Sequence, residues 1–157
     1  MKPHIGISDK NLKKTSDILS SVLANEMMLY VKTRKAHWNV RGENFMELHR
    51  LYEEHYKLIE ESADAVAERI GKMGHTAIGT MTEFIKLSTI KENAGKNGSS
   101  KETLRELLKD HETVIVQLRS DAADCIDKNK DSGTADFLTW IMEGHETMAW
   151  ILRRYLD

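Results

Sequence analysis

Apolar residues recur at helical intervals through four long stretches of this 157-residue chain, and no proline interrupts any of them. The single proline is Pro3, close to the start of the sequence. Apolar side chains spaced three and four positions apart form one face of an α-helix, and that face has to be buried against another element. The pattern therefore predicts an all-α fold in which four amphipathic helices pack as a bundle.

Capping signals and glycines mark the ends of the first two helices. Ser8 is a suitable N-cap for the first helix, which we expect to end just before Gly42. Asn44 followed by Glu47 predicts a capping box, in which each side chain bonds to the other residue's backbone N–H. The second helix is then expected over about residues 44–72.

The connection that follows the second helix, residues 73–99, is long for a helical bundle and contains several glycines. Thr80 and Glu83 predict another capping box there, and a short helix after it. The third and fourth long helices are expected over about residues 99–128 and 134–155. We thus predict a four-helix bundle with a short extra helix between its second and third long helices.

Size and charge limit the classes of protein that the chain can belong to. We expect residues 1–157 to form a single domain, with residues 1–8 as a short flexible N-terminal arm. The net charge of −2 gives no bulk electrostatic attraction for a nucleic acid. No apolar run approaches the roughly 20 residues that span a membrane. Cys125 is the single cysteine, so no intrachain disulfide can form, which favours a cytoplasmic location.

Histidines and carboxylates recur on the second helix at spacings that suit metal ligation. His49 and Glu53 lie four positions apart, and Asp64 and Glu68 repeat this spacing. Residues four apart lie one above the other on a helix, so each pair can hold an ion. His37 lies close by, near the end of the first helix. Imidazole nitrogen and carboxylate oxygen are ligands that iron, manganese and zinc accept.

The two pairs cannot bind one ion within one chain. Glu53 and Asp64 are separated by roughly 16 Å of helix, whereas metal–ligand bonds are about 2 Å long. A second copy of the helix, running antiparallel, would bring His49 and Glu53 of one chain against Asp64 and Glu68 of the other. A twofold axis would create two such sites at once. The spacing therefore indicates a metal site between subunits.

Two simpler interpretations fit the sequence less well. The carboxylates could form an ordinary solvated face, but repulsion between them gives no reason for histidines to join the cluster. A di-iron site inside the bundle would require Glu-x-x-His motifs, and no histidine in this chain has a glutamate three positions before it.

The same residues carry a resemblance to a known family. The pattern H-W-N-x-R-G-x-x-F-x-x-x-H begins at His37, a carboxylate follows at Glu53, and D-x-x-x-E-R begins at Asp64. This pattern resembles the Dps family of ferritin-like mini-ferritins, and the likeness extends through TADFLT at residues 134–139 to Trp150. It covers nearly the whole chain.

The resemblance implies a function and a set of site residues. Dps proteins oxidise ferrous iron, preferably with hydrogen peroxide, at a site between subunits with two iron positions. They store ferric iron in a hollow dodecamer and so protect cells from oxidative stress. Carried over by position, the ligands are His37, His49, Glu53, Asp64 and Glu68, with Trp38 beside them. The family most often has Asp at the position of Glu53, and the glutamate side chain is one methylene longer. We expect this difference to change the geometry and affinity of the second, weaker iron position.

Two further roles follow from the resemblance. Carboxylates near the junction of the third and fourth helices line threefold pores through which iron enters the shell, and Asp121, Asp131 and Asp136 match those positions. Some members compact DNA with a lysine-rich tail. Here that alternative predicts only weak, salt-sensitive DNA binding, because the N-terminal arm is short and the net charge is negative.

Overall fold

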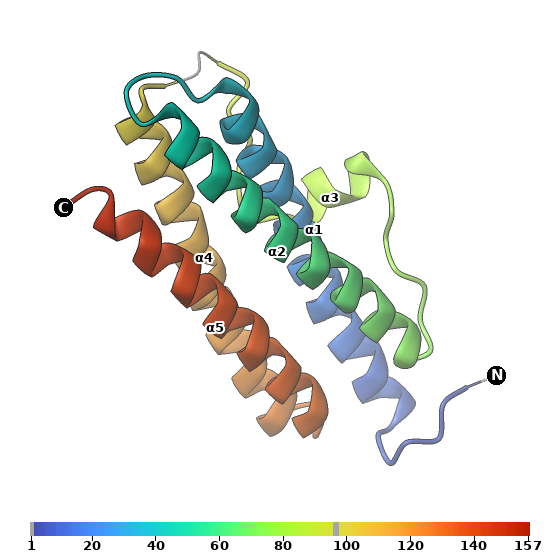
Figure 1. Ribbon diagram of the computed structural model, residues 1–157. Helices are drawn as coiled ribbons and strands as arrows, with labels where there is room; N and C mark the ends of the chain where they lie inside the picture. The colour runs from blue at the N-terminus through green and yellow to red at the C-terminus, as the bar shows by residue number, and fades with distance from the viewer. Residues whose placement is uncertain (1, 96–97) are drawn as a thin grey trace.

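The computed structural model describes residues 2–95 and 98–157, and its long helices run almost the full length of the molecule (Figure 1). The helices are α1 (Asp9–Asn39), α2 (Phe45–Lys72), α3 (Met81–Leu87), α4 (Ser100–Asp127) and α5 (Ser132–Arg154). The four long ones form a bundle, and α3 lies in the connection between α2 and α4. The predicted all-α, ferritin-like bundle with a short extra helix is confirmed.

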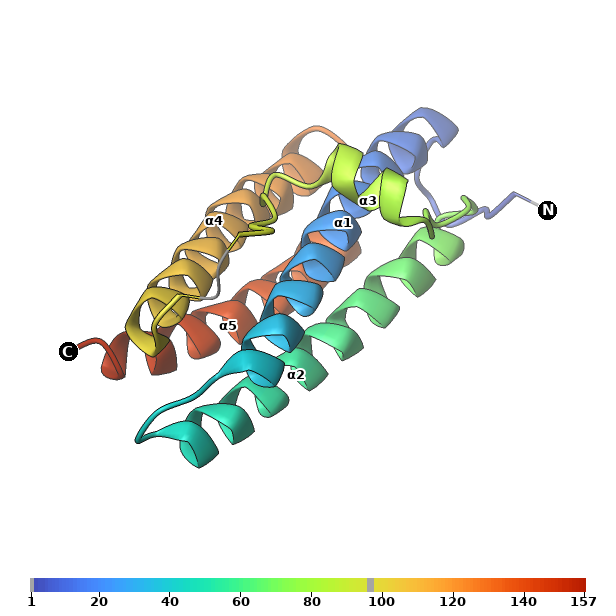
Figure 2. The ribbon, with the colours of Figure 1, turned by 90° about the horizontal axis from the view of Figure 1, so that it is seen from above.

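The bundle consists of two helical hairpins. Helix α1 packs along α2, and α4 packs along α5. The connection after α2 runs back along the outside of the bundle, where α3 packs against α1 (Figure 2). This return path makes one long crossover between the hairpins, and the other connections are short turns.

Side-chain caps start three of the helices where the sequence predicts them. The Ser8 hydroxyl accepts a hydrogen bond from the backbone N–H of Asn11 at the start of α1. Complete capping boxes begin α3, with Thr80, and α4, with Ser99. Each cap satisfies backbone N–H groups that have no partner inside the helix.

The predicted cap at the start of α2 is wrong. The Asn44 side chain makes no cap hydrogen bond, so the predicted capping box of α2 does not form. Helix α1 ends at Asn39 with Val40 as its C-cap, close to the expected end, and Gly42 turns the chain toward α2 with a φ of 110°. Helix α5 begins earlier than expected because Asp131 caps it, accepting from the backbone N–H of Thr134.

The core is formed by apolar side chains from all four long helices. The largest that are fully buried include Leu19, Leu29, Tyr52, Ile59, Ile70, Leu118, Leu138, Ile141 and Leu152. Several large apolar side chains of these helices lie outside the core. Ile126, Trp140 and Trp150 are each about half exposed. The helical repeat predicts the buried stripe but not where that stripe stops.

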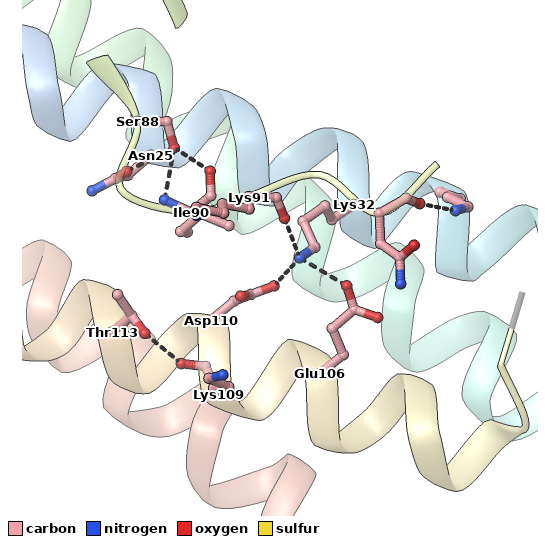
Figure 3. Close-up of polar contacts among 11 residues, drawn as sticks. Asn25, Lys32, Ser88, Ile90, Lys91, Glu106, Lys109, Asp110 and Thr113 are labelled. Carbon is pink, nitrogen blue, oxygen red and sulfur yellow. Dashed lines mark hydrogen bonds and ion pairs between the residues drawn. The ribbon is translucent and has the colours of Figure 1, made fainter. Parts of the chain in front are cut away.

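Polar contacts hold the crossover connection against the bundle (Figure 3). Lys32 of α1 donates a hydrogen bond to the Lys91 carbonyl and forms ion pairs with Glu106 and Asp110 of α4, at 2.9 and 2.6 Å. The Asn25 side-chain oxygen accepts hydrogen bonds from the backbone N–H of Thr89 and from the Ser88 hydroxyl. The crossover is therefore fastened to α1, and Lys32 also links α1 to α4 of the other hairpin.

The N-terminal arm contacts the far end of α2. Gly74 has a φ of 80°, and a Cβ atom built there would lie 2.6 Å from a ring carbon of Pro3. Glycine is needed at this position both for the backbone angle and for the close approach of the arm. In the described ranges, no helix is long and apolar enough to cross a membrane.

Candidate metal centre

His37 and His49 meet beside the turn that joins α1 to α2. Their rings stack with centroids 3.7 Å apart and an interplanar angle of 19°. Each Nδ1 lies within hydrogen-bond distance of the other residue's backbone carbonyl oxygen, at 2.8 Å for His37 and 3.0 Å for His49. The end of one helix and the start of the next thus hold the two imidazoles in a reciprocal arrangement.

These contacts determine which ring nitrogens are free. A carbonyl oxygen can only accept a hydrogen bond, so Nδ1 of His37 and of His49 must carry the proton. In the neutral rings, Nε2 then keeps its lone pair. Backbone carbonyls orient metal-ligating histidines in the same way in many proteins. Nε2 is therefore the nitrogen of each ring that remains available to a ligand.

Glu53 lies one helical turn beyond His49 and is close to both imidazoles. Lys57 Nζ donates to Glu53 Oε1 at 2.7 Å. This hydrogen bond and the charge of Lys57 lower the pKa of Glu53, and His37 and His49 lower it further. Glu53 is therefore a carboxylate at neutral pH, and the hydrogen bond from Lys57 engages only its Oε1 atom.

Asp64 and Glu68 lie farther along α2, on its solvent-exposed side. Glu68 pairs with Lys72 at 3.3 Å. Asp64 lines a groove of about 290 Å³ whose walls come from α1, α2 and α3. In residues 2–95 and 98–157, no three histidine, cysteine or carboxylate side chains converge closely enough to hold a metal ion. The predicted ligands therefore form two separate groups in one chain.

Tyr56 and Arg34, which the sequence motif does not include, border the histidine pair together with Trp38. The ring of Tyr56 stands edge-on to His37, with centroids 5.3 Å apart. The Arg34 guanidinium lies over the rings of Tyr56 and Trp38, at 4.4 and 5.5 Å from their centroids. Trp38 itself is 64% exposed. Helical spacing gives a signal for Arg34, because it stands four positions before Trp38 on the same face.

Comparison with known proteins places this geometry in a family. The chain matches the ferritin-like domain family over residues 16–157. It is 34% identical to a DNA protection during starvation protein of Brevibacillus brevis, over 89% of this chain and 93% of the relative. The chain belongs to the Dps family of ferritin-like proteins.

A second relative and a solved structure are also similar to this chain. The Dps chain is 42% identical to an uncharacterized low temperature-induced protein of Nostoc sp., over 98% of this chain and 86% of the relative. Its fold superposes on DpsC from Streptomyces coelicolor with a TM-score of 0.95 and 26% identity, covering 100% of this chain and 91% of that one.

The three carboxylates assigned to an iron pore have different surroundings in this Dps chain. Asp131 is buried, and its two oxygens accept from the Thr134 backbone N–H and hydroxyl at 2.9 and 2.6 Å. Asp121 is also buried and accepts from the Gln117 amide, whereas Asp136 is exposed. Asp131 thus has a capping role that the sequence did not reveal. The pore assignment of Asp121, Asp131 and Asp136 stays a prediction.

A second cluster of metal-binding residue types lies inside the Dps bundle. The cluster consists of Glu26, His55, His111 and His145, all of them buried. Its members are scattered along the chain, so spacing gave no signal.

Proposed function

We propose that this Dps protein sequesters iron as a ferroxidase, with its active site built between two subunits. The observation that supports this most strongly is that the predicted ligands form two separate groups within one chain. His37, His49 and Glu53 gather at one end, and Asp64 and Glu68 lie beyond the reach of the same ion. Two antiparallel copies of α2 would complete two equivalent sites.

The surface around the ligands supports such a contact. Trp38, Phe45, Met46 and Leu58 are large apolar side chains on the α1–α2 hairpin, and each is between 39% and 64% exposed. Apolar groups collected around a polar site are typical of a surface that a partner covers. A second copy of the chain would bury them and place its own Asp64 and Glu68 opposite the histidines.

Each group has a chemical task in the proposed reaction. Histidine Nε2 atoms hold ferrous iron, and the carboxylate oxygens stabilise the ferric product more than the ferrous substrate. Hydrogen peroxide accepts one electron from each of two ferrous ions and, with two protons, gives two water molecules and two ferric ions. Because both electrons arrive together, no hydroxyl radical is released. We infer that Trp38, the neighbour of His37 in the sequence, supplies an electron when only one iron is bound.

The wider setting follows from the family. Iron storage and protection from oxidative damage are the functions that the Dps relatives support for this chain. We place the activity in the cytoplasm, where the single thiol of Cys125 would remain reduced. The relatives' name refers to DNA protection. For this chain we expect direct DNA binding to be weak, because its net charge is −2.

The assembly can be tested first. We expect light scattering to give a particle of about twelve times the 18.0 kDa chain mass, since closed symmetry repeats the twofold contact around a shell. Replacing Leu58 on the exposed hairpin by Asp should shift the particles toward smaller species, whereas Val116→Asp, on the exposed side of α4, serves as a matched control. A wild-type chain that stays monomeric at micromolar concentration would refute both the shell and the shared site.

The oxidant preference is a separate prediction. We expect hydrogen peroxide to oxidise bound ferrous iron at least about tenfold faster than oxygen does, a difference of about 1.4 kcal/mol in barrier. Stopped-flow absorbance of the ferric product, with each oxidant added to anaerobically loaded shells, measures both rates. Equal rates would show that the site does not prefer peroxide, and the proposed protective chemistry would be wrong.

A further inference from the structure

Four buried ionisable side chains meet in the middle of the bundle, one from each long helix. They are Glu26 of α1, His55 of α2, His111 of α4 and His145 of α5, and we call them the core quartet. Each is at most 2% exposed. Burying such groups costs free energy unless they are paired with each other or with a ligand.

Part of the quartet is paired. Glu26 Oε1 lies 2.8 Å from His145 Nε2, and His145 Nδ1 lies 2.8 Å from His111 Nδ1. With Glu26 ionised and both rings neutral, His145 donates to the carboxylate and accepts from His111. His111 Nε2 is then left with a lone pair and no proton. This chain extends the carboxylate–histidine pairing that orients metal-ligating histidines in other proteins.

The remaining polar atoms of the quartet have no partner among the described residues. They are Glu26 Oε2, His111 Nε2 and both ring nitrogens of His55. The His55 ring stands almost perpendicular to that of His111, with centroids 6.0 Å apart. A buried polar atom left without a hydrogen bond destabilises the fold, so several of them in one place indicate that something else binds there.

We infer that the core quartet binds one divalent transition-metal ion of the zinc type, with His55, His111 and Glu26 as ligands and His145 holding two of them in place. Imidazole nitrogens with one carboxylate oxygen form a ligand set that suits tetrahedral Zn²⁺ or Co²⁺. Burial lowers the pKa of His111 well below its usual value, which keeps the ring in the neutral, metal-binding form.

The charge of the quartet indicates one ion and not two. Three neutral imidazoles and one carboxylate leave a net charge of +1 after one divalent ion is bound, and a second ion would have no further carboxylate to neutralise it. Di-iron sites in bundle cores use a carboxylate from every helix. Here α2, α4 and α5 each contribute a histidine to the quartet. The site is therefore suited to hold a metal and not to cycle two irons.

Binding requires a side-chain adjustment. No three donors converge on one point in the described part of the chain, so the His55 ring has to turn toward His111, and Glu26 has to turn its free oxygen inward. The quartet is also separate from the proposed ferroxidase site, because His55 faces the bundle interior and Glu53 lies on the outer side of α2.

The experiment measures Co²⁺ in shells that lack the outer site. We expect the double variant His49→Ala/Asp64→Ala to retain about one Co²⁺ per chain after dialysis and to show the intense visible absorption of tetrahedral cobalt. Adding His111→Leu should remove both signals. His75→Leu, which replaces a half-buried histidine outside both sites, should leave them unchanged. Zn²⁺ should raise the midpoint of thermal unfolding only where the quartet is intact.

Folding controls keep the result interpretable. Far-UV circular dichroism and particle mass are measured for every variant, and His55→Phe, which conserves ring volume, replaces His111→Leu if the latter does not fold. If the double variant does not assemble, wild type and His55→Phe are compared, and the difference should again be about one ion per chain. Folded shells without retained Co²⁺, or with equal retention after the quartet is altered, would overturn the inference. None of these readouts depends on iron oxidation.

Discussion

Shells reassembled from equal amounts of His37→Ala and Asp64→Ala chains should recover about a quarter of the ferroxidase sites, although each variant alone has almost none. His37 and Asp64 lie in separate groups along one chain, so each proposed site takes one from each subunit. About half of the twofold pairs are mixed by chance. In a mixed pair one site carries both substitutions and the other carries neither.

The measurement is the initial rate of ferrous iron oxidation by peroxide, before and after the two variants are unfolded together and refolded. Mass spectrometry of intact shells has to show that both chains are present. Shells of each variant refolded alone provide the baseline. If co-assembled shells oxidise iron no faster than that baseline, His37 and Asp64 do not act across a subunit boundary, and the proposed site is wrong.

Mild acid should destabilise the metal-free protein strongly, because burial holds two core histidines in their neutral form. Burial lowers the pKa of His55 from 6.5 to about 4, with a smaller contribution from His145. The pKa of His111 is lowered as well. The unfolded chain takes up these protons as the pH falls below 6.5, whereas folded His55 does not until about pH 4. The free energy of unfolding is therefore highest above pH 6.5. Between pH 6.5 and about pH 4 it falls by about 1.4 kcal/mol per pH unit for each histidine.

Guanidinium unfolding of chelator-treated protein at about pH 7 and pH 5 measures this effect. For His55 alone the loss over that interval is on the order of 2 kcal/mol. His55→Phe should therefore lose less stability on acidification than wild type does, even if it is less stable at pH 7. His75→Gln is the matched control and should follow the wild-type pH dependence. An equally steep decline in His55→Phe would show that burial of this imidazole is not the cause.

The sequence was sufficient to predict the helices because the signals that form them are local. Apolar residues at helical intervals define each buried face, and a serine or threonine followed by a glutamate begins α3 and α4 as expected. The prediction failed at Asn44, where the side chain makes no cap, and at Asp131, which caps α5. Both lie in short turns, where packing of the neighbouring helices determines which residue reaches the free backbone groups.

The two groups of ligands on α2 could likewise be predicted from spacing, because four positions along a helix bring side chains onto one face. Tertiary structure decided the rest. Only folding brings the His37 and His49 rings together, and only there do the backbone carbonyls fix the proton on Nδ1. The core quartet has no sequence signature, since Glu26 and His145 are 119 positions apart and meet because the bundle packs four helices around one axis.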